Sequence, residues 1–405
     1  MSRKVLITFL GTGGVRNEDS RNYRKAIYFK DDFESETPFI SAALIDYLNI
    51  DYVLMFGTLK SMWEAVYLHY TDEINIDQDF TYALFSSCEN AKYSDLLSNE
   101  YITHLENKLG GNWNLNLIHY GISENEIQTN FEIFTKALNV LKHGDQIYLD
   151  ITHSFRSLPL FATTAIDFIN TVSNKDLQVN GIYYGMLEAS AEFGNKAPIV
   201  ELNYISELQK WIKGSYAFTK YGASDLLESL LRTDNKTIAD KLNDFTDMLS
   251  MNFIHEVDSK LAVIKSLSKE FEKMSGPSAL IIPQIFKQFI IYFRQAKKLS
   301  EYQFLLSKWH YKNSNFALSY LCLVEAIVTF VCEKECIAYL GEDNRNMAKK
   351  YIINNLNYTS VKEIFSPANK IRTSVTHLTG NKNIGAKQSI ISLDKFIKDF
   401  EKIIF

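Results

Sequence analysis

Short runs of β-branched and aromatic residues alternate with longer amphipathic segments through the first half of the chain, up to about residue 205. Runs this short are typical of buried strands, and the segments between them have the periodicity of helices. The predicted strands are 5–10, 52–56, 82–85, 115–120, 146–151 and 181–184. The predicted helices are 59–69, 91–109, 124–141 and 158–171. This alternation predicts an α/β domain with a mostly parallel sheet.

The pattern changes after Asn203, where the strand signal stops and helical periodicity becomes almost continuous. The predicted helices of this part are 206–211, 225–231, 239–252, 257–273, 283–298, 316–340 and 346–355. A turn at 274–278 divides it. We therefore expect an α/β domain over 1–205, a helical connector over 206–275 and an all-α domain over 276–405.

The segment 150–159 combines hydroxyls, an imidazole and a guanidinium directly after a predicted strand and before a predicted helix. Unpaired backbone N–H groups and the helix dipole favour an anion at such a junction, and an arginine can bind two phosphate oxygens at once. The candidate phosphate ligands of this segment are Thr152, His153, Ser154 and Arg156. A simpler interpretation is that Ser157 caps the following helix, with Pro159 in its first turn. Capping explains one serine and leaves the other polar residues without a role.

Other predicted strands also end in small or hydroxyl residues. Ligands of parallel α/β sheets bind at these carboxyl ends, so the residues there are expected to join the same phosphate site. They are Gly11, Thr12, Gly13, Gly14, Thr58 and Ser86. For the glycine turn alone, a simple tight turn is the alternative.

The glycine turn does not fit the fingerprint of a dinucleotide-binding site. Arg16 stands where that fingerprint needs its third glycine. The segments 23–29 and 38–48 that follow have the pattern of a strand or hairpin, whereas the fingerprint requires a helix at once. We therefore exclude a nicotinamide dinucleotide site.

A second candidate site lies near the C-terminus, where Arg372 and His377 form an R-x4-H pair. Ser366 and Pro367 have the residue types of a helix N-cap and first position, and Gly380 is placed to end the helix. Because the spacing alone arises easily by chance, the pair gains weight only from its context. A solvated polar helix face is the alternative interpretation.

The helical wheel predicts how these two side chains are presented. Ile371, Val375 and Leu378 form an apolar stripe, and the pair flanks the opposite face, which carries Thr373 and Thr376. The two side chains diverge by roughly 140° on one helix. Two such helices that meet across a two-fold axis would bring two arginines and two histidines together, so symmetric assembly would build the site.

With this pair, RNA cleavage is chemically feasible without a metal. A histidine can move protons near neutral pH, and an arginine can stabilise the charge that develops when a 2′-hydroxyl attacks the adjacent phosphorus. The product would carry a 2′,3′-cyclic phosphate. No cluster of Asp, Glu, Cys and His at metal-ligand spacing is evident in the sequence.

The composition of the chain limits the classes of partner that the protein is expected to bind. The net charge of −5 excludes a basic surface that binds nucleic acid through its bulk field, so no stable DNA binding is expected and any RNA contact must be local. The cysteines lack a paired CxxC framework, and the N-terminal apolar run is too short for a secretory signal. The apolar segment 317–332, interrupted by Glu325, is expected to be a buried helix with no membrane role. These features predict a cytoplasmic protein.

The N-terminal half resembles the CRISPR-associated Rossmann-fold (CARF) sensors. The resemblance rests on Gly11-Thr12-Gly13-Gly14, on 57–63 (Gly-Thr-Leu-Lys-Ser-Met-Trp), on 150–159 and on Tyr183-Tyr184-Gly185. It implies a Rossmann-like sensor domain that forms a homodimer, with higher oligomers open. It also implies that the strand-end residues bind cyclic oligoadenylate, as the tetra- or hexa-adenylate, which acts as the allosteric activator in type III CRISPR antiviral defence.

Within that family the chain is most similar to the accessory ribonucleases that join the sensor to a C-terminal HEPN domain. The resemblance implies that 276–405 is HEPN-like, that Arg372 and His377 are catalytic, and that single-stranded RNA is the substrate of a metal-independent endoribonuclease. Thr373 follows the arginine where many HEPN proteins have an amide or acidic residue. Two alternatives stay open: a ring nuclease that cleaves the cyclic oligoadenylate in the sensor pocket, and a non-enzymatic regulator that responds to the same ligand.

Overall fold

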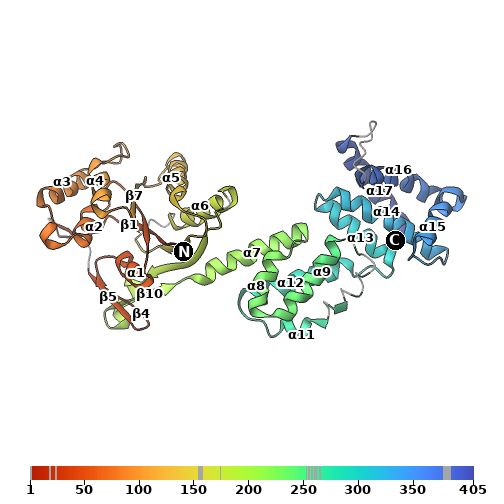
Figure 1. The fold of residues 1–405 in the computed structure, drawn as a ribbon, viewed down its shortest axis with the longest axis horizontal. Helices are drawn as coiled ribbons and strands as arrows, with labels where there is room; N and C mark the ends of the chain where they lie inside the picture. Colours follow the sequence, from red (N-terminus) through yellow and green to blue (C-terminus); the bar gives the residue numbers. More distant parts are fainter. Residues whose placement is uncertain are drawn as a thin grey trace. The chain divides into compact units, whose positions relative to one another are not determined.

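A computed structural model gives the structure of the chain. It describes residues 2–17, 20–22, 25–153, 158–173, 175–251, 253, 256, 259, 262–263, 266–376 and 385–405. The chain divides into two compact units, Met1–Ser206 and Glu207–Phe405. Figure 1 shows strands and helices mixed in the first unit, whereas the described residues of the second form helices.

The first unit is built on a mixed sheet whose described strands follow the order β5-β4-β10-β9-β8-β1-β6-β7. Strands β9, β8, β1, β6 and β7 are parallel to one another. Strand β10 is antiparallel to β9 and parallel to β4, and β5 is antiparallel to β4. A short hairpin of β2 and β3 stands apart. The strands are β1 Lys4–Leu10, β2 Gly14–Asn17, β3 Ser20–Asn22, β4 Ala26–Lys30, β5 Phe33–Thr37, β6 Tyr52–Gly57, β7 Trp113–Leu117, β8 Gln146–Asp150, β9 Gln178–Gly185 and β10 Lys196–Glu201.

Helices cover both faces of this sheet (Figure 1). They are α1 Ile40–Leu48, α2 Trp63–Tyr70, α3 Gln78–Glu89, α4 Glu100–Leu109, α5 Glu124–Ala137 and α6 Leu158–Ser173. Val5, Ile7 and Phe9 of β1 face α5 and α6, while Leu6 faces α1 and Leu10 faces α2 and α4. Because both faces are buried, β1 has a nearly continuous apolar run, interrupted by Thr8, rather than an alternating one. The sequence-based prediction of a mostly parallel α/β sheet is confirmed for this central part.

Two predicted strands of this unit are wrong. The segment 82–85 lies inside helix α3, whose first turn is capped by Asp77 through a 3.0 Å hydrogen bond from the Phe80 amide. Leu84 and Cys88 are its buried residues, a four-residue spacing that belongs to a helix. The segment 38–48 contains helix α1, so only the predicted segment 23–29, which overlaps β4, contains a strand. Its hairpin partner β5 lies between the two predicted segments.

The second unit contains two hydrophobic cores. The first joins α7, α8, α9 and α12 with part of α13, and the second joins the rest of α13 with α14, α15, α16 and α17. The helices are α7 Asn203–Tyr221, α8 Asp225–Asp234, α9 Lys236–Ser250, α11 Ser268–Phe271, α12 Gly276–Phe293, α13 Leu299–Lys312, α14 Phe316–Lys334, α15 Glu342–Asn354, α16 Thr359–Thr376 and α17 Ala386–Ile404. Helix α12 packs in the same core as α7, α8 and α9, whereas the sequence analysis predicted a domain boundary directly before it, between residues 275 and 276.

Helix α14 is the centre of the second core. By length and composition it could cross a membrane, with a mean hydropathy of 1.8, but 67% of its apolar window is buried within the protein. Its buried face packs against α16 and α17 through residues such as Leu323, Ile327 and Val331. The prediction that the apolar segment 317–332 forms a buried helix is confirmed.

The buried His310 on α13 predicts a pH-dependent stability. Its side chain is 2% exposed, neither ring nitrogen has a partner among the described residues, and burial lowers its pKa to about 4. The unfolded chain takes up this proton below about pH 6.5, and the folded chain does so only near its own lower pKa. Lowering the pH from 7 to 5 should therefore lower the unfolding free energy by about 2 kcal/mol through this one group.

We expect His310→Leu to remove this part of the pH dependence, because leucine fills the site without a titratable group. The measurement is the urea-induced unfolding transition of the second unit, recorded at pH 7 and pH 5 for the parent protein and for His310→Leu. An equal loss of stability between these pH values in the two proteins would show that His310 is not responsible.

Candidate functional site

A cavity of about 200 Å³ opens at the carboxyl ends of the central strands β1, β6, β7 and β8. The register that pairs Leu10 with Gly57 places the ends of β1 and β6 side by side. The lining residues are Leu10, Gly11, Thr12, Phe56, Gly57, Thr58, Ile118, His153 and Leu158. The fold thus brings together Gly11, Thr12, Thr58 and His153, four of the residues that the sequence nominated as phosphate ligands.

Two glycines are required by the close packing around this cavity. Gly13 has a φ of +71°, and a Cβ placed there would overlap the sulfur of Met62. A Cβ on Gly57 would lie 2.6 Å from the Trp63 ring, which is closer than real contacts allow. Without a Cβ, these two positions let the side chains of Met62 and Trp63 pack directly against the backbone beside the cavity. Gly14, the other glycine of the turn, begins strand β2.

Ser61 ties the loop after β6 to the end of β1. Its hydroxyl donates to the carbonyl of Leu10 at 2.7 Å and accepts from the amide of Thr58 at 2.9 Å. The indole of Trp63 donates to the carbonyl of Thr58 at 2.9 Å. Thr58 is therefore held, 2% exposed, by fixed neighbours. Ser61 was not among the predicted site residues, because a serine four positions beyond a strand has no recognisable signal by itself.

The end of β8 is fixed by a buried carboxylate. Asp150 is 0% exposed and accepts hydrogen bonds from the Thr8 hydroxyl at 2.7 Å and from the Thr152 amide at 2.9 Å. The Thr152 hydroxyl accepts from the amide of Gly185 at 2.8 Å and does not line the cavity. Thr152 thus holds the β8 and β9 ends together, a role that differs from the direct ligand contact predicted for it.

This network predicts a stability effect for Thr8. Thr8→Val keeps the shape of the side chain but removes the hydroxyl that satisfies Asp150, which should lower the unfolding free energy of the first unit by about 1.5–3 kcal/mol. Thr164→Val, on the exposed side of α6, is the control and should change it by less than about 0.5 kcal/mol. Urea unfolding measures both. Equal stabilities of the two variants would contradict the assigned role of the Thr8–Asp150 bond.

His153 reaches into the cavity from the loop after β8. Burial lowers its pKa, and the nearby carboxylates of Asp150 and Glu188 oppose part of that shift. Near neutral pH the ring is therefore neutral and can exchange hydrogen bonds or accept a proton. Ser154 and Arg156, with Ser157, lie outside the described residues.

Ser86 does not belong to this site. The prediction placed it after a strand, but it lies in helix α3, where its hydroxyl accepts a hydrogen bond from the Asn90 side chain at 3.1 Å. The error follows from the aromatic run 82–85, whose composition suits a strand while its burial has helical spacing.

The second candidate site lies on α16, which contains Arg372. The helix begins at Thr359, so the prediction that Ser366 caps it and Pro367 opens it is wrong. Val361 and Ile364 are buried in the second core, and this packing carries the helix through the proline despite its cost. His377 and Gly380 lie outside the described residues.

The predicted apolar stripe of α16 is wrong at Val375, which is 42% exposed. The buried face instead runs through Ile364, Ala368 and Ile371, a spacing of three to four residues. Leu378 lies outside the described residues. The error arose because the helix was predicted to begin at Ser366. The stripe was therefore assigned without the two turns before Pro367, whose buried residues define the face that packs in the core.

Arg372 is half-buried and held by a carboxylate. Its guanidinium contacts Glu325 of α14 at 3.1 Å, and Glu325 also pairs with Arg345 of α15. Arg345 in turn donates to the hydroxyl of Thr329 at 3.3 Å. The arrangement places two arginines around one carboxylate, so Arg372 is oriented and does not lie on a fully solvated face. Glu325, the charge that interrupts an apolar helix, is the sequence signal that could have predicted this partner.

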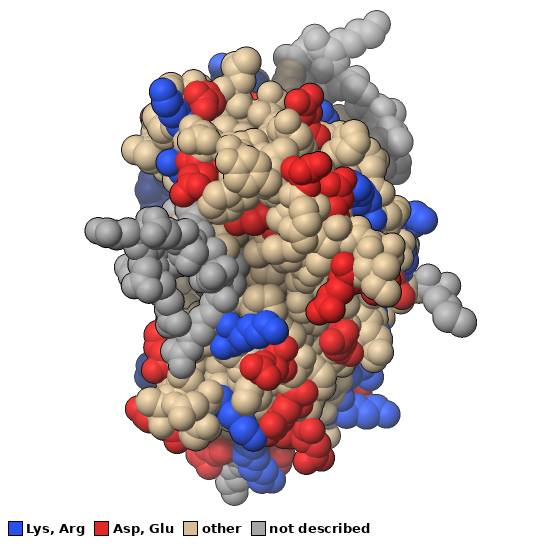
Figure 2. Space-filling model, turned by 90° about the vertical axis from the view of Figure 1, so that its left-hand side faces the viewer, with Lys and Arg blue, Asp and Glu red and all other residues tan. Residues whose placement is uncertain are grey.

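Charged side chains of both signs are mixed on one face of the molecule. On the face shown in Figure 2, Lys and Arg are interspersed with Asp and Glu, and no broad area carries positive charge alone. Among the described residues, no group of three His, Cys, Asp or Glu side chains could hold a metal ion.

Comparisons with known proteins cover both units. A family model described as the CARF domain of the CRISPR system endoribonuclease Csx1 matches residues 5–188, and one described as the second domain of the CRISPR-associated protein MJ1674 matches residues 207–301. The CRISPR-associated protein MJ1674 of Methanocaldococcus jannaschii is 33% identical over 433 residues, which cover 99% of this chain and 67% of that protein. The mixed sheet agrees with a Rossmann-like sensor domain. The chain therefore belongs to the CARF-domain accessory proteins of CRISPR systems.

Proposed function

We propose that this protein is a cyclic-oligoadenylate-activated endoribonuclease that cuts single-stranded RNA in type III CRISPR defence. The observation that carries the proposal is the strand-end cavity, which unites Gly11, Thr12, Thr58 and His153 in a CARF-type domain. CARF domains in general bind cyclic oligoadenylate, and the family model that matches the first unit is named for the endoribonuclease Csx1. The helical second unit, with Arg372, supplies the candidate catalytic side.

The size of the cavity supports sharing of the ligand between two protomers. At about 200 Å³ it is smaller than the usual 300–1,000 Å³ of a site that encloses one small molecule, and a cyclic tetra-adenylate carries four nucleotides. A homodimer would place two such cavities around one symmetric ring, so that each strand-end loop meets the phosphates of its own half. Ligand binding that favours the active arrangement would then shift the population of the helical units.

In the proposed reaction His377 takes the proton of the 2′-hydroxyl, or returns one to the leaving 5′-oxygen, while Arg372 stabilises the negative charge that grows on the phosphorane oxygens. The new bond joins the 2′-oxygen to phosphorus, the bond to the 5′-oxygen breaks, and a 2′,3′-cyclic phosphate results. The ion pair with Glu325, which Arg345 also contacts, holds the Arg372 guanidinium in one orientation before RNA binds. Such preorganisation lowers the cost of orienting the guanidinium.

A ring nuclease is the second candidate, and His153 is the observation that favours it. A neutral imidazole in the strand-end cavity could accept the 2′-hydroxyl proton of the bound ligand itself. This reaction would destroy the activator rather than bulk RNA.

One experiment separates these functions. Labelled single-stranded RNA and labelled cyclic tetra- or hexa-adenylate are incubated together with the full chain, and both are followed over time. RNA loss with intact activator is expected for the endoribonuclease. Loss of the activator with intact RNA would favour the ring nuclease, and binding without loss of either would favour a regulator.

A further inference from the structure

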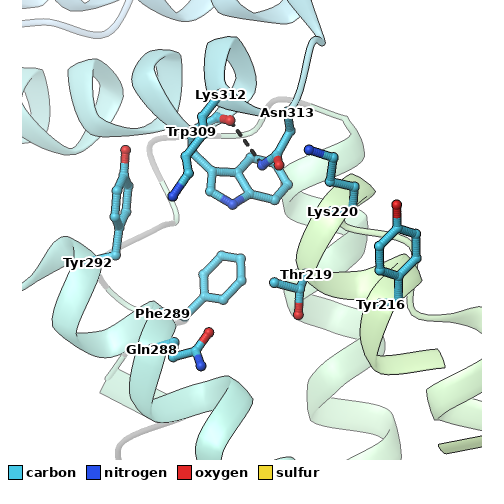
Figure 3. A pocket seen from close by; sticks show the side chains of 9 residues that line it. All are labelled: Tyr216, Thr219, Lys220, Gln288, Phe289, Tyr292, Trp309, Lys312 and Asn313. Carbon is cyan, nitrogen blue, oxygen red and sulfur yellow. Dashed lines mark hydrogen bonds between the residues drawn. The ribbon is translucent and has the colours of Figure 1, made fainter. Parts of the chain in front are cut away.

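The second unit contains a cavity of about 320 Å³ between α7, α12 and α13 that the proposed reaction does not use (Figure 3). All of its lining residues come from the second unit. It shares no lining residue with the strand-end cavity, and Arg372 is not among the residues that line it.

The walls of this cavity are aromatic. Phe289 and Trp309 are 6% and 8% exposed, with ring centres 5.8 Å apart and planes tilted by 56°. Trp309 packs against Gly222, where a Cβ would lie 3.1 Å from the indole. Gly222 directly follows the last residue of α7, and its φ of +74° lets the chain change direction there. Tyr292 is fixed by donating to the carbonyl of Leu305 at 2.9 Å. The rings are thus held in place and form a preformed apolar wall whose two faces are inclined to each other.

The rim of the cavity is basic and polar. In Figure 3, Lys220 of α7 and Lys312 of α13 extend on either side of the Trp309 ring. Asn313 and Gln288 also line the cavity, and the amide nitrogen of Asn313 donates to the carbonyl of Trp309 at 3.0 Å, which leaves its amide oxygen as an acceptor. In the described part of the chain neither lysine forms an ion pair, and no lining residue is acidic. The cavity therefore repels cations, which aromatic boxes otherwise bind, and attracts an anion.

We propose that this cavity binds one nucleotide, with its base against Phe289 and Trp309 and its phosphate between Lys220 and Lys312. Aromatic side chains stack on any base, lysines bind phosphate as point charges, and amides such as Asn313 can pair with base edges. The volume lies at the low end of small-molecule sites and accommodates one nucleotide rather than a cyclic oligoadenylate. The nucleotide is either free or one unit of a single-stranded RNA.

The test is calorimetric titration of the full chain with adenosine monophosphate, with ribose 5-phosphate and with a 2′-O-methylated pentanucleotide, which cannot be cut by 2′-hydroxyl attack. The test variant is Lys220→Met/Lys312→Met, which keeps the apolar stems. The control is Lys210→Met/Lys287→Met, which removes two exposed lysines from α7 and α12 that do not line the cavity. Both variants change the net charge equally.

The nucleotide or the oligonucleotide should bind the parent protein and the control with equal affinity and the test variant at least about tenfold more weakly, because two charge-assisted contacts are lost. Binding of the monophosphate would identify a free nucleotide, and binding of the oligonucleotide alone an RNA strand. No binding to the parent protein at millimolar ligand, unchanged affinity in the test variant, or equal affinity for ribose 5-phosphate would each overturn the proposal.

Discussion

Arg372→Ala is expected to lower the rate of RNA cleavage about 10²–10³-fold, the usual cost of losing one group that stabilises a developing oxyanion. The half-buried guanidinium is already aimed by Glu325, so few other side chains could replace it. Arg345 stays paired with Glu325 in this variant, and the fold should therefore survive. Cleavage is measured on labelled RNA at saturating activator, with thermal unfolding as a check on folding.

Lys370→Ala is the matched control, since Lys370 lies two residues earlier on α16 with an exposed side chain. It should cleave like the parent protein. His377→Ala should lose activity to a similar extent as Arg372→Ala, because a shared reaction step needs both groups. Cleavage by Arg372→Ala at the rate of the control would remove Arg372 from the catalytic role.

Gly13→Val is expected to abolish binding of cyclic oligoadenylate, with a loss of at least about 100-fold in affinity. Two costs add at this position: the φ of +71° is strained for valine, and its Cβ would collide with Met62. Met62 donates its amide to the Gly11 carbonyl at 3.1 Å, so its displacement moves the loop that lines the cavity. Equilibrium dialysis with labelled ligand measures the affinity.

Gly194→Val separates strain from position. Gly194 has a φ of +64°, and a Cβ there would meet open space. This control carries the same backbone strain away from the cavity and should keep its affinity within about threefold. If Gly13→Val bound as tightly as Gly194→Val, the glycine turn would not shape the ligand site.

The central strands could be predicted because burial on both faces leaves a nearly continuous apolar run, as in Val5 to Leu10, which only Thr8 interrupts. The same reasoning failed at 82–85, where aromatic residues occupy an amphipathic helix and Tyr82 is 73% exposed. A strand and a helix at 82–85 would differ in which side chains are buried, and this burial depends on tertiary contacts that the local sequence does not reveal.

The strand-end residues could be predicted individually, but not the contacts that hold them. Chain order does not reveal that Ser61 bonds to the end of β1 or that Asp150 accepts from Thr8, because these partners are brought together by the parallel register. The same limit applies to α16. Its start at Thr359 depends on packing against α14, which overrides the local preference of Ser366 and Pro367 for a helix start.

The most direct test of the central proposal is the ratio of RNA cleavage rates with and without cyclic oligoadenylate, measured in EDTA with cyclic tetra-adenylate and cyclic hexa-adenylate in parallel. We expect one of the two rings to raise the rate strongly and the products to end in 2′,3′-cyclic phosphates. Equal rates with and without either ring, at concentrations where the ligand is shown to bind, would contradict the proposal that this sensor domain activates a ribonuclease.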